Sequence, residues 1–202
     1  MLKIKLILFW INCLLPVVLI VSYFADLYTL YELGEQIGRI ALFILWLVLL
    51  PGIIKRLELK GRIAKIGINL KVIRRQLGIM VFEFGLIHYF WMVAFFYIKK
   101  GFPTDFSLIP KFQTFGFLAL LLFVPLAITS NDFFTKLLKK YWHWVHRLVY
   151  ISALLLVFHL GFNGKYTGYF FAIVTELILI LELVSWVRYF WKGRKKKEVL
   201  GS

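Results

Sequence analysis

The sequence predicts an all-α membrane protein, a bundle of six transmembrane helices with both termini in the cytoplasm. Three observations lead to this prediction. The 202-residue chain is 61% hydrophobic and has a mean hydropathy of +0.83, above the composition of soluble domains. Its apolar runs approach the length that crosses a bilayer. Its positive charges gather in the segments between those runs, as topology signals do.

Six apolar segments are predicted to span the membrane, and residues 1–202 together are predicted to form a single transmembrane domain. The spans cover residues 6–25, 37–54, 77–98, 112–129, 141–162 and 168–191. The first has a basic start and a long apolar core, with no small-x-small cleavage site after it. We therefore interpret it as an uncleaved span and not as a signal peptide.

The distribution of basic residues predicts the orientation. Twenty of the 25 Lys and Arg residues fall on one side of this topology, eight of them in the segment 55–75. The positive-inside rule places that side, with both termini, in the cytoplasm, and an even number of spans agrees with it. Membrane topology thus accounts for the net charge of +15, and no nucleic-acid partner is expected. Segment 55–75 is either a basic amphipathic helix on membrane lipid or a solvated loop.

Two histidines are predicted to lie at the same depth in the outer half of the membrane. His88 is thirteen residues beyond Arg75, and His159 is twelve residues beyond Arg147, in two spans that both run outwards. Both imidazoles would lie roughly 18–20 Å beyond the basic boundary. Such a pair can hold a metal between two helices, and haem iron suits it. No third or fourth zinc ligand is apparent. The alternative is that each histidine is hydrogen-bonded to a neighbouring helix.

The other two histidines lie nearer the cytoplasm. His146 precedes His159 by thirteen residues, or about 20 Å of helix, so the two cannot bind the same metal. At the depth of His146, the third span carries Arg74 and Arg75. A second haem at His146 would therefore need an unusual partner or an open coordination position. His143 is expected to be an interfacial residue without a metal.

Three segments together resemble the ferric-reductase-like transmembrane superfamily. They are "RRQLGI…FEFGLIHYF", "PLAITSND" and "HRLVYISALLLVFH". The nearest group in that superfamily is the haem-binding membrane subunits of bacterial periplasmic methionine sulfoxide reductase systems. The resemblance implies that His88 and His159 bind an outer b-type haem and that His146 matches an inner-haem ligand. In the related NADPH oxidases a histidine stands fourteen residues before the outer ligand, where this chain has Arg74.

The resemblance also implies a function and a location. Electrons would pass from a cytoplasmic flavin reductase or a membrane quinol, through one or two haems b, to a periplasmic molybdopterin subunit. The chain would be an electron-transfer subunit of the bacterial inner membrane and not the catalytic subunit. FMN or quinone is a further cofactor that this route allows. Arg74 and Arg75 would hold haem propionates or a flavin phosphate, or would serve only as topogenic charge.

Two other function classes stay open at this stage. One is a self-contained transmembrane ferric or oxygen reductase, which would share the haem but need no periplasmic partner. The other is a cofactor-free transporter or scaffold, suggested by three acidic residues within spans, Glu83, Glu176 and Glu182. Glu83 would either pair with a polar group in the bundle or carry protons to a quinone.

Overall fold

The computed structural model confirms the all-α class. It describes residues 27–101, 105 and 108–200, together with residues 14, 17, 18, 21, 22 and 24, and this part of the chain contains no β-strand. Five helical segments within it are long and apolar enough to cross a membrane: Leu30–Arg56, Gly61–Lys100, Lys111–Ile128, Lys140–Phe162 and Tyr166–Lys192. They correspond to the second to sixth predicted spans. The first predicted span, residues 6–25, lies almost entirely outside the described residues.

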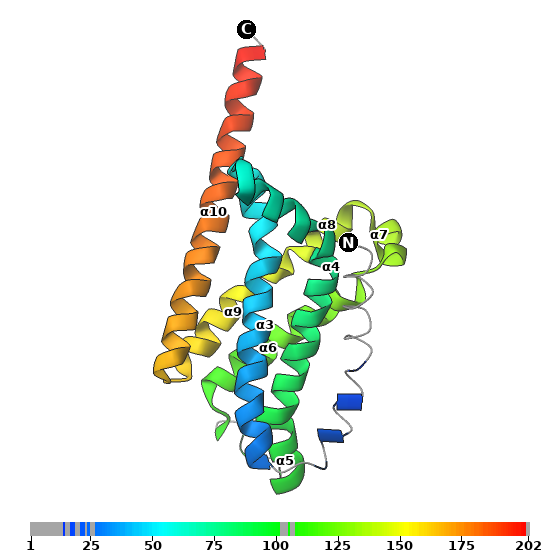
Figure 1. Cartoon of the computed structure of the whole chain (residues 1–202), viewed down its shortest axis with the longest axis vertical. Helices are drawn as coiled ribbons and strands as arrows, with labels where there is room; N and C mark the ends of the chain where they lie inside the picture. The colour runs from blue at the N-terminus through cyan, green and yellow to red at the C-terminus, as the bar shows by residue number, and fades with distance from the viewer. Residues whose placement is uncertain are drawn as a thin grey trace.

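From Leu27 onward the described residues form nine helical elements, which include the five spans (Figure 1). They are α3 (Leu27–Arg56), α4 (Gly61–Tyr89), the π-helix η1 (Phe90–Ala94), α5 (Phe95–Lys100), α6 (Lys111–Ile128), α7 (Asp132–Leu138), α8 (Lys140–His146), α9 (Leu148–Phe162) and α10 (Tyr166–Leu200). Local chemistry explains the breaks between them. Gly61 has a φ of +68° where α3 turns into α4, a conformation that glycine adopts without strain. The side chain of Asn131 caps α7 by accepting a hydrogen bond from the Phe134 N–H at 2.9 Å.

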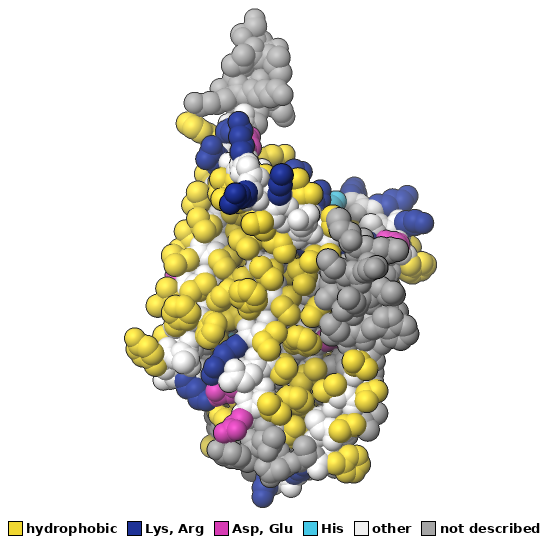
Figure 2. Space-filling model, viewed as in Figure 1, with side chains coloured by type: hydrophobic (Ala, Val, Ile, Leu, Met, Phe, Trp, Pro, Cys, Tyr) yellow, Lys and Arg dark blue, Asp and Glu magenta, His cyan; other side chains and the backbone are white. Residues whose placement is uncertain are grey.

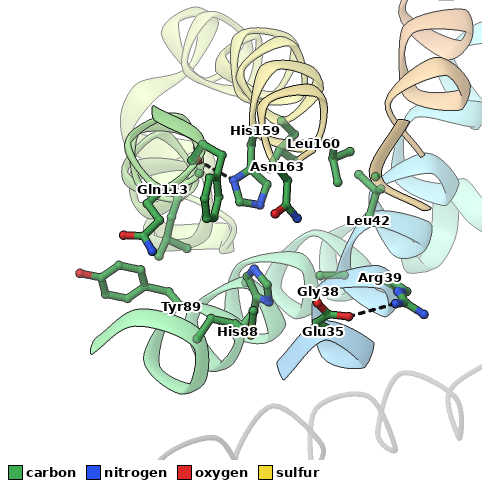
Figure 3. Close-up of a pocket in the computed structure, with 18 of the residues that line it drawn as sticks. Glu35, Gly38, Arg39, Leu42, His88, Tyr89, Gln113, His159, Leu160 and Asn163 are labelled. Carbon is green, nitrogen blue, oxygen red and sulfur yellow. Dashed lines mark hydrogen bonds and ion pairs between the residues drawn. The ribbon is translucent and has the colours of Figure 1, made fainter. Parts of the chain in front are cut away.

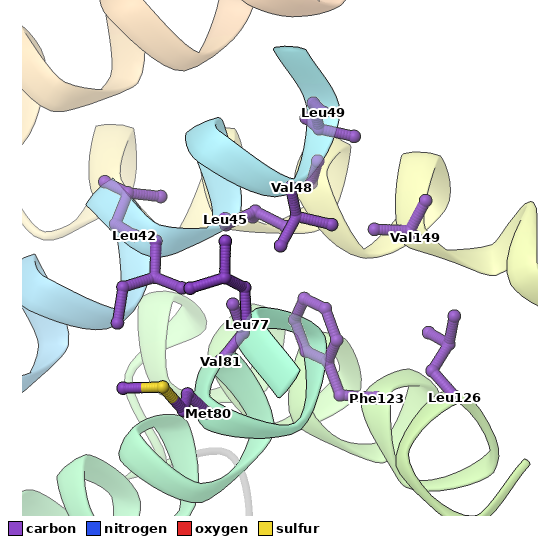
Figure 4. Packing of buried hydrophobic residues seen from close by; sticks show 12 residues of the cluster. Leu42, Leu45, Val48, Leu49, Leu77, Met80, Val81, Phe123, Leu126 and Val149 are labelled. Atoms are coloured by element: carbon purple, nitrogen blue, oxygen red, sulfur yellow. The ribbon is translucent and has the colours of Figure 1, made fainter. Parts of the chain in front are cut away.

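The helices pack as two antiparallel pairs with α10 alongside. Helix α3 packs against α4, α6 packs against α9, and α10 contacts both α9 and α3 (Figure 1). On α3, Leu42, Leu45 and Leu49 recur at the spacing of one helical face and are buried. They meet apolar side chains of α4, α6 and α9 in a common core (Figure 4). This core brings the inner faces of four helices together.

Small and apolar residues divide between the inside and the outside as in membrane bundles. Ala119, Ser152, Ala153, Thr175 and Ser185 are fully buried, and small residues of this kind let helices approach closely. Many large apolar side chains outside the core stay exposed along the outer faces. Figure 2 shows them over the middle of the molecule, with Lys and Arg gathered toward the end where α10 projects. A continuous apolar exterior of this kind suits a lipid environment.

A buried ion-pair cluster joins α3, α9 and α10. The guanidinium of Arg56 pairs with the Glu182 carboxylate, and its Nε donates to Ser185 Oγ at 2.8 Å. The Tyr150 hydroxyl donates to Glu182 Oε1 at 2.5 Å. The ring of Trp186 lies 4.5 Å from the Arg56 guanidinium carbon. Since a buried charge is costly unless it is paired, these contacts hold the three helices in one arrangement.

Glu182→Gln is expected to destabilise the protein by about 3 kcal/mol, because it leaves buried Arg56 beside a neutral amide. For a chain of this size, the loss corresponds to a fall of roughly 6–12 °C in the thermal unfolding midpoint measured in detergent. Glu176→Gln is the matched control, since it makes the same change on the exposed face of α10. Its effect should stay within about 0.5 kcal/mol. Equal midpoints for the two variants would contradict a structural role for the cluster.

Candidate functional site

A cavity of about 260 Å³ opens between the two helix pairs, and His88 and His159 point toward each other across it (Figure 3). His88 comes from α4 and His159 from α9. Their ring centres lie 6.1 Å apart, and the ring planes cross at 86°. The remaining lining is mostly apolar, with polar side chains contributed by Glu35, Arg39, Gln113, Asn163, Lys165 and Thr167. The sequence predicted that His88 and His159 lie at the same depth, and the structure places their imidazoles next to each other.

Each imidazole is anchored through Nδ1 to a backbone carbonyl of the neighbouring helix. His88 Nδ1 lies 2.8 Å from the carbonyl oxygen of Gly34 on α3, and His159 Nδ1 lies 2.7 Å from that of Phe112 on α6. A carbonyl oxygen can only accept a hydrogen bond, so both Nδ1 atoms carry the proton. The Nε2 atom of each ring then keeps its lone pair. This is the tautomer that metal-ligating histidines adopt when Nδ1–H is held by an outer partner.

The geometry of the pair fits two axial ligands of one metal. Two imidazole–metal bonds of about 2 Å each, with the distance from each nitrogen to its ring centre, require centres about 6 Å apart. The observed 6.1 Å meets this requirement. The described residues hold no cluster of three or more His, Cys, Asp or Glu side chains that could complete a tetrahedral site. Two opposed imidazoles in an apolar cavity therefore suit the axial positions of haem iron better than zinc.

Three charged residues line the same cavity. The Glu35 carboxylate pairs with Arg39, at 3.2 Å, and with Lys165 (Figure 3 draws the Arg39 contact). The two cations are partly exposed, at 37% and 42% of their side-chain surface, whereas Glu35 is more buried. Cations at this position can receive the carboxylates of a bound macrocycle. Neither cation was predicted from the sequence as a site residue. Arg39 could have been, because a charged residue inside a predicted span is a candidate for a functional role.

His146 does not line this cavity. Its Nε2 lies 3.2 Å from Thr129 Oγ1, and its ring stacks against Trp142 with centres 3.9 Å apart. The break between α8 and α9 falls at Arg147, directly after it. His143 is exposed and packs edge-on against Trp142. The structure therefore separates these two histidines from the pair formed by His88 and His159.

Arg74 and Arg75 also lie away from the cavity, near the middle of α4. Arg75 Nη1 pairs with Asp132 Oδ1 at 2.7 Å, and this contact is exposed. The cations that line the His88–His159 cavity are Arg39 and Lys165 instead.

The glutamates within the spans have different surroundings. Glu83 is buried on α4, Glu182 is engaged by Arg56 and Tyr150, and Glu176 is exposed on α10. None of the three lines the cavity. Among the described residues, Glu83, Glu176 and Glu182 therefore do not form a continuous polar route along the cavity wall.

Comparison with known proteins gives consistent relatives. The chain is 35% identical over 132 residues to a protein of Herminiimonas arsenicoxydans, covering 62% of this chain and 58% of that protein. It is 31% identical over 140 residues to a protein of Ralstonia nicotianae, covering 64% and 61%. It is 31% identical over 133 residues to a protein of Rhizobium meliloti, covering 65% and 58%. All three are named "Protein-methionine-sulfoxide reductase heme-binding subunit MsrQ".

The family match covers part of the site. The chain spans about three fifths of the length of these curated relatives. No solved structure matches it. The sequence family described as "Ferric reductase like transmembrane component" matches residues 37–157, which is more than half of the chain and includes His88, although His159 falls just beyond the match. Family match, relatives and helical architecture agree, and the chain belongs to the ferric-reductase-like transmembrane family.

Proposed function

We propose that this protein is a haem b-binding membrane subunit that carries electrons across the bilayer to a methionine sulfoxide reductase. The observation that carries the proposal is the opposed pair of imidazoles, each held by Nδ1 with Nε2 directed into an apolar cavity. The names of the relatives, which describe haem-binding subunits of that reductase, support the same function. The protein is then an electron-transfer subunit and not the catalytic one.

In this proposal the residues of the cavity have separate tasks. His88 and His159 would hold the haem iron through Nε2, and their Nδ1–H bonds to carbonyls would strengthen them as ligands. Arg39 and Lys165 receive the propionates, and Glu35 holds both cations in place. The apolar lining would keep water away from the metal and so lower the dielectric constant around it. Haem, when bound, supplies one-electron chemistry that no side chain of the cavity provides.

The proposed topology has six spans in a single domain, with both termini in the cytoplasm of a bacterium and the helices in its inner membrane. The basic residues of segment 55–75 and of the stretch after Arg188 support this orientation. His88 lies thirteen residues beyond Arg75 on α4, about 20 Å further along the helix. The haem would therefore lie in the outer half, near a periplasmic acceptor.

The donor and acceptor follow from the orientation. The acceptor is proposed to be a periplasmic molybdopterin subunit that reduces methionine sulfoxide, the lesion that oxidation leaves on methionine. The donor is a membrane quinol or a cytoplasmic flavin reductase, and FMN is a candidate intermediate carrier. Arg74 and Arg75 at the inner end are the candidate contacts for a flavin phosphate, and His146 is the candidate ligand of a second haem.

His88→Ala and His159→Ala should each abolish most haem binding, because each removes one of two axial bonds. The measurement is haem per mole of purified protein by the pyridine haemochrome method, together with the Soret band and its shift on reduction. His143→Ala is the matched control, since His143 is exposed and lies outside the cavity. Unchanged haem content in both variants, or colourless wild-type protein with an intact fold, would refute the proposed pair.

His146→Ala separates one haem from two. If the protein binds a single haem at the His88–His159 pair, this variant should keep the wild-type haem content and spectrum. A fall from two haems to one would instead establish His146 as a ligand. Thr129→Val serves as a control, because it removes the hydroxyl beside His146 Nε2 without removing the imidazole.

A self-contained ferric or oxygen reductase is the second candidate, and the ferric reductase named in the description of the family favours it. Stopped-flow oxidation of the dithionite-reduced protein distinguishes the two. An electron-transfer subunit should be reoxidised at least tenfold faster by its purified periplasmic reductase with a sulfoxide substrate than by ferric citrate or oxygen. Fast turnover with ferric citrate or oxygen, and no response to the reductase, would favour the self-contained enzyme.

A further inference from the structure

The two histidines of the cavity sit in matching backbone cradles. The carbonyl that accepts from His88 belongs to Gly34, and four residues later α3 has Gly38. The carbonyl that accepts from His159 belongs to Phe112, and four residues later α6 has Gly116. In both pairs of helices, a glycine thus stands one turn beyond the accepting carbonyl, directly beneath the imidazole.

Each glycine is required by the position of the ring above it. A Cβ atom added to Gly38 would lie 2.7 Å from His88 Nδ1 and 2.9 Å from its Cε1. A Cβ added to Gly116 would lie 2.7 Å from His159 Nδ1 and 3.0 Å from its Cε1. Atoms in a packed interior do not approach this closely, so an alanine at either position would force the imidazole to move.

Helix geometry explains the four-residue spacing. The carbonyl of residue i points along the helix toward residue i+4, whose N–H it accepts. Its second lone pair can accept another hydrogen bond only where the side chain of residue i+4 leaves room. Glycine at i+4 removes that obstacle. The carbonyls of Gly34 and Phe112 can therefore serve both their own helix and the imidazole of the next helix.

The other described helical glycines do not lie beneath an imidazole. An added Cβ at Gly34, Gly67 or Gly168 would instead meet Met92 Sδ at 2.9 Å, Ile54 Cγ2 at 2.9 Å or the Leu160 carbonyl oxygen at 2.8 Å. A Cβ atom at Gly78 on α4, or at Gly161 on α9, would meet nothing within 4 Å. Gly85 lines the same cavity, yet its added Cβ would make only an ordinary contact of 3.5 Å with Leu120. Among the described glycines, a close approach to an imidazole is thus confined to Gly38 and Gly116, and the chain supplies matched controls on the very helices that carry the rings.

We infer that Gly38 and Gly116 are positioning residues that fix the tautomer and ring plane of His88 and His159 by uncovering the carbonyls of Gly34 and Phe112. The tautomer of each ring depends only on contacts within this chain and does not require bound haem. The consequence for bound haem rests on the proposed function. With both rings held, the crossing angle of 86° between the ligand planes is a property of the two helix pairs. The hydrogen bonds also increase electron donation to the metal, which favours the ferric state.

The haem-free protein provides the first test, by ¹⁵N NMR of histidine side chains at neutral pH. Signals are assigned by their loss in His88→Gln and His159→Gln. Wild-type protein should carry the proton of both rings on Nδ1. Gly38→Ala should shift only the His88 signals toward the Nε2–H tautomer, and Gly116→Ala only those of His159. Gly78→Ala and Gly161→Ala should leave both unchanged. Nε2–H rings in the wild type would overturn the inference even if an alanine variant failed to fold.

The haem-loaded protein provides the second test. Gly38→Ala and Gly116→Ala should lower haem affinity roughly tenfold or more, the usual effect of losing an outer partner of a ligand. In the haem they retain, the reduction potential should rise. The largest g value in the electron paramagnetic resonance spectrum should fall as the ring planes leave their crossed orientation. The Gly78 and Gly161 variants should match the wild type in all three.

The two tests fail in distinguishable ways. Wild-type protein with Nδ1–H rings but no haem would refute the proposed function and leave the positioning role intact. Alanine variants with wild-type tautomers, haem affinity, potential and g values would overturn the positioning role and leave haem binding intact. Alanine variants that lose only thermal stability, with unchanged tautomers and spectra, would reduce both glycines to helix-packing residues and also overturn the inference.

Discussion

The hydrogen bonds from two imidazole Nδ1–H groups to helix carbonyls join the packing of the bundle to its chemistry. Each bond crosses one of the two large helix interfaces, α3 with α4 and α6 with α9. The position of each ring is therefore set by how its own helix pair packs. The separation of the two rings is set by how the pairs meet in the common core. A change in helix packing is thereby transmitted to the Nε2 atoms of both rings.

The same arrangement occurs twice in the chain. The first helix of each pair supplies a carbonyl and a glycine four residues later, and the second supplies the histidine. Sequence comparison within the chain gives no clear repeat, because only a carbonyl, a glycine and a histidine need to be preserved. The two pairs are thus alike in backbone geometry while their surrounding side chains differ. Since both pairs run in the same direction through the bundle, their histidines meet at one depth.

Much of the architecture follows from residue counting. Apolar runs located five of the described helices, and distances from basic residues put His88 and His159 at one level. What the sequence could not provide depends on tertiary contact. Counting along one span cannot reveal that Lys165 joins the pair formed by Glu35 and Arg39, since Lys165 comes from a segment far along the chain. The buried pairing of Arg56 with Glu182 and the glycines beneath the histidines were equally hidden, because their partners lie on other helices.

The depth of the histidine pair has a kinetic consequence. About 20 Å of uninterrupted helix separates the basic end of α4 at Arg75 from His88. Electron tunnelling slows exponentially with distance, so if the pair holds haem as proposed, a donor confined to the aqueous surface would exchange electrons with that haem slowly. A donor that enters the apolar region, or a second redox centre near His146, would divide the crossing into shorter steps. The distance that would shield the proposed haem from reductants in solution thus also makes the cytoplasmic half of the bundle limit the rate at which electrons reach it.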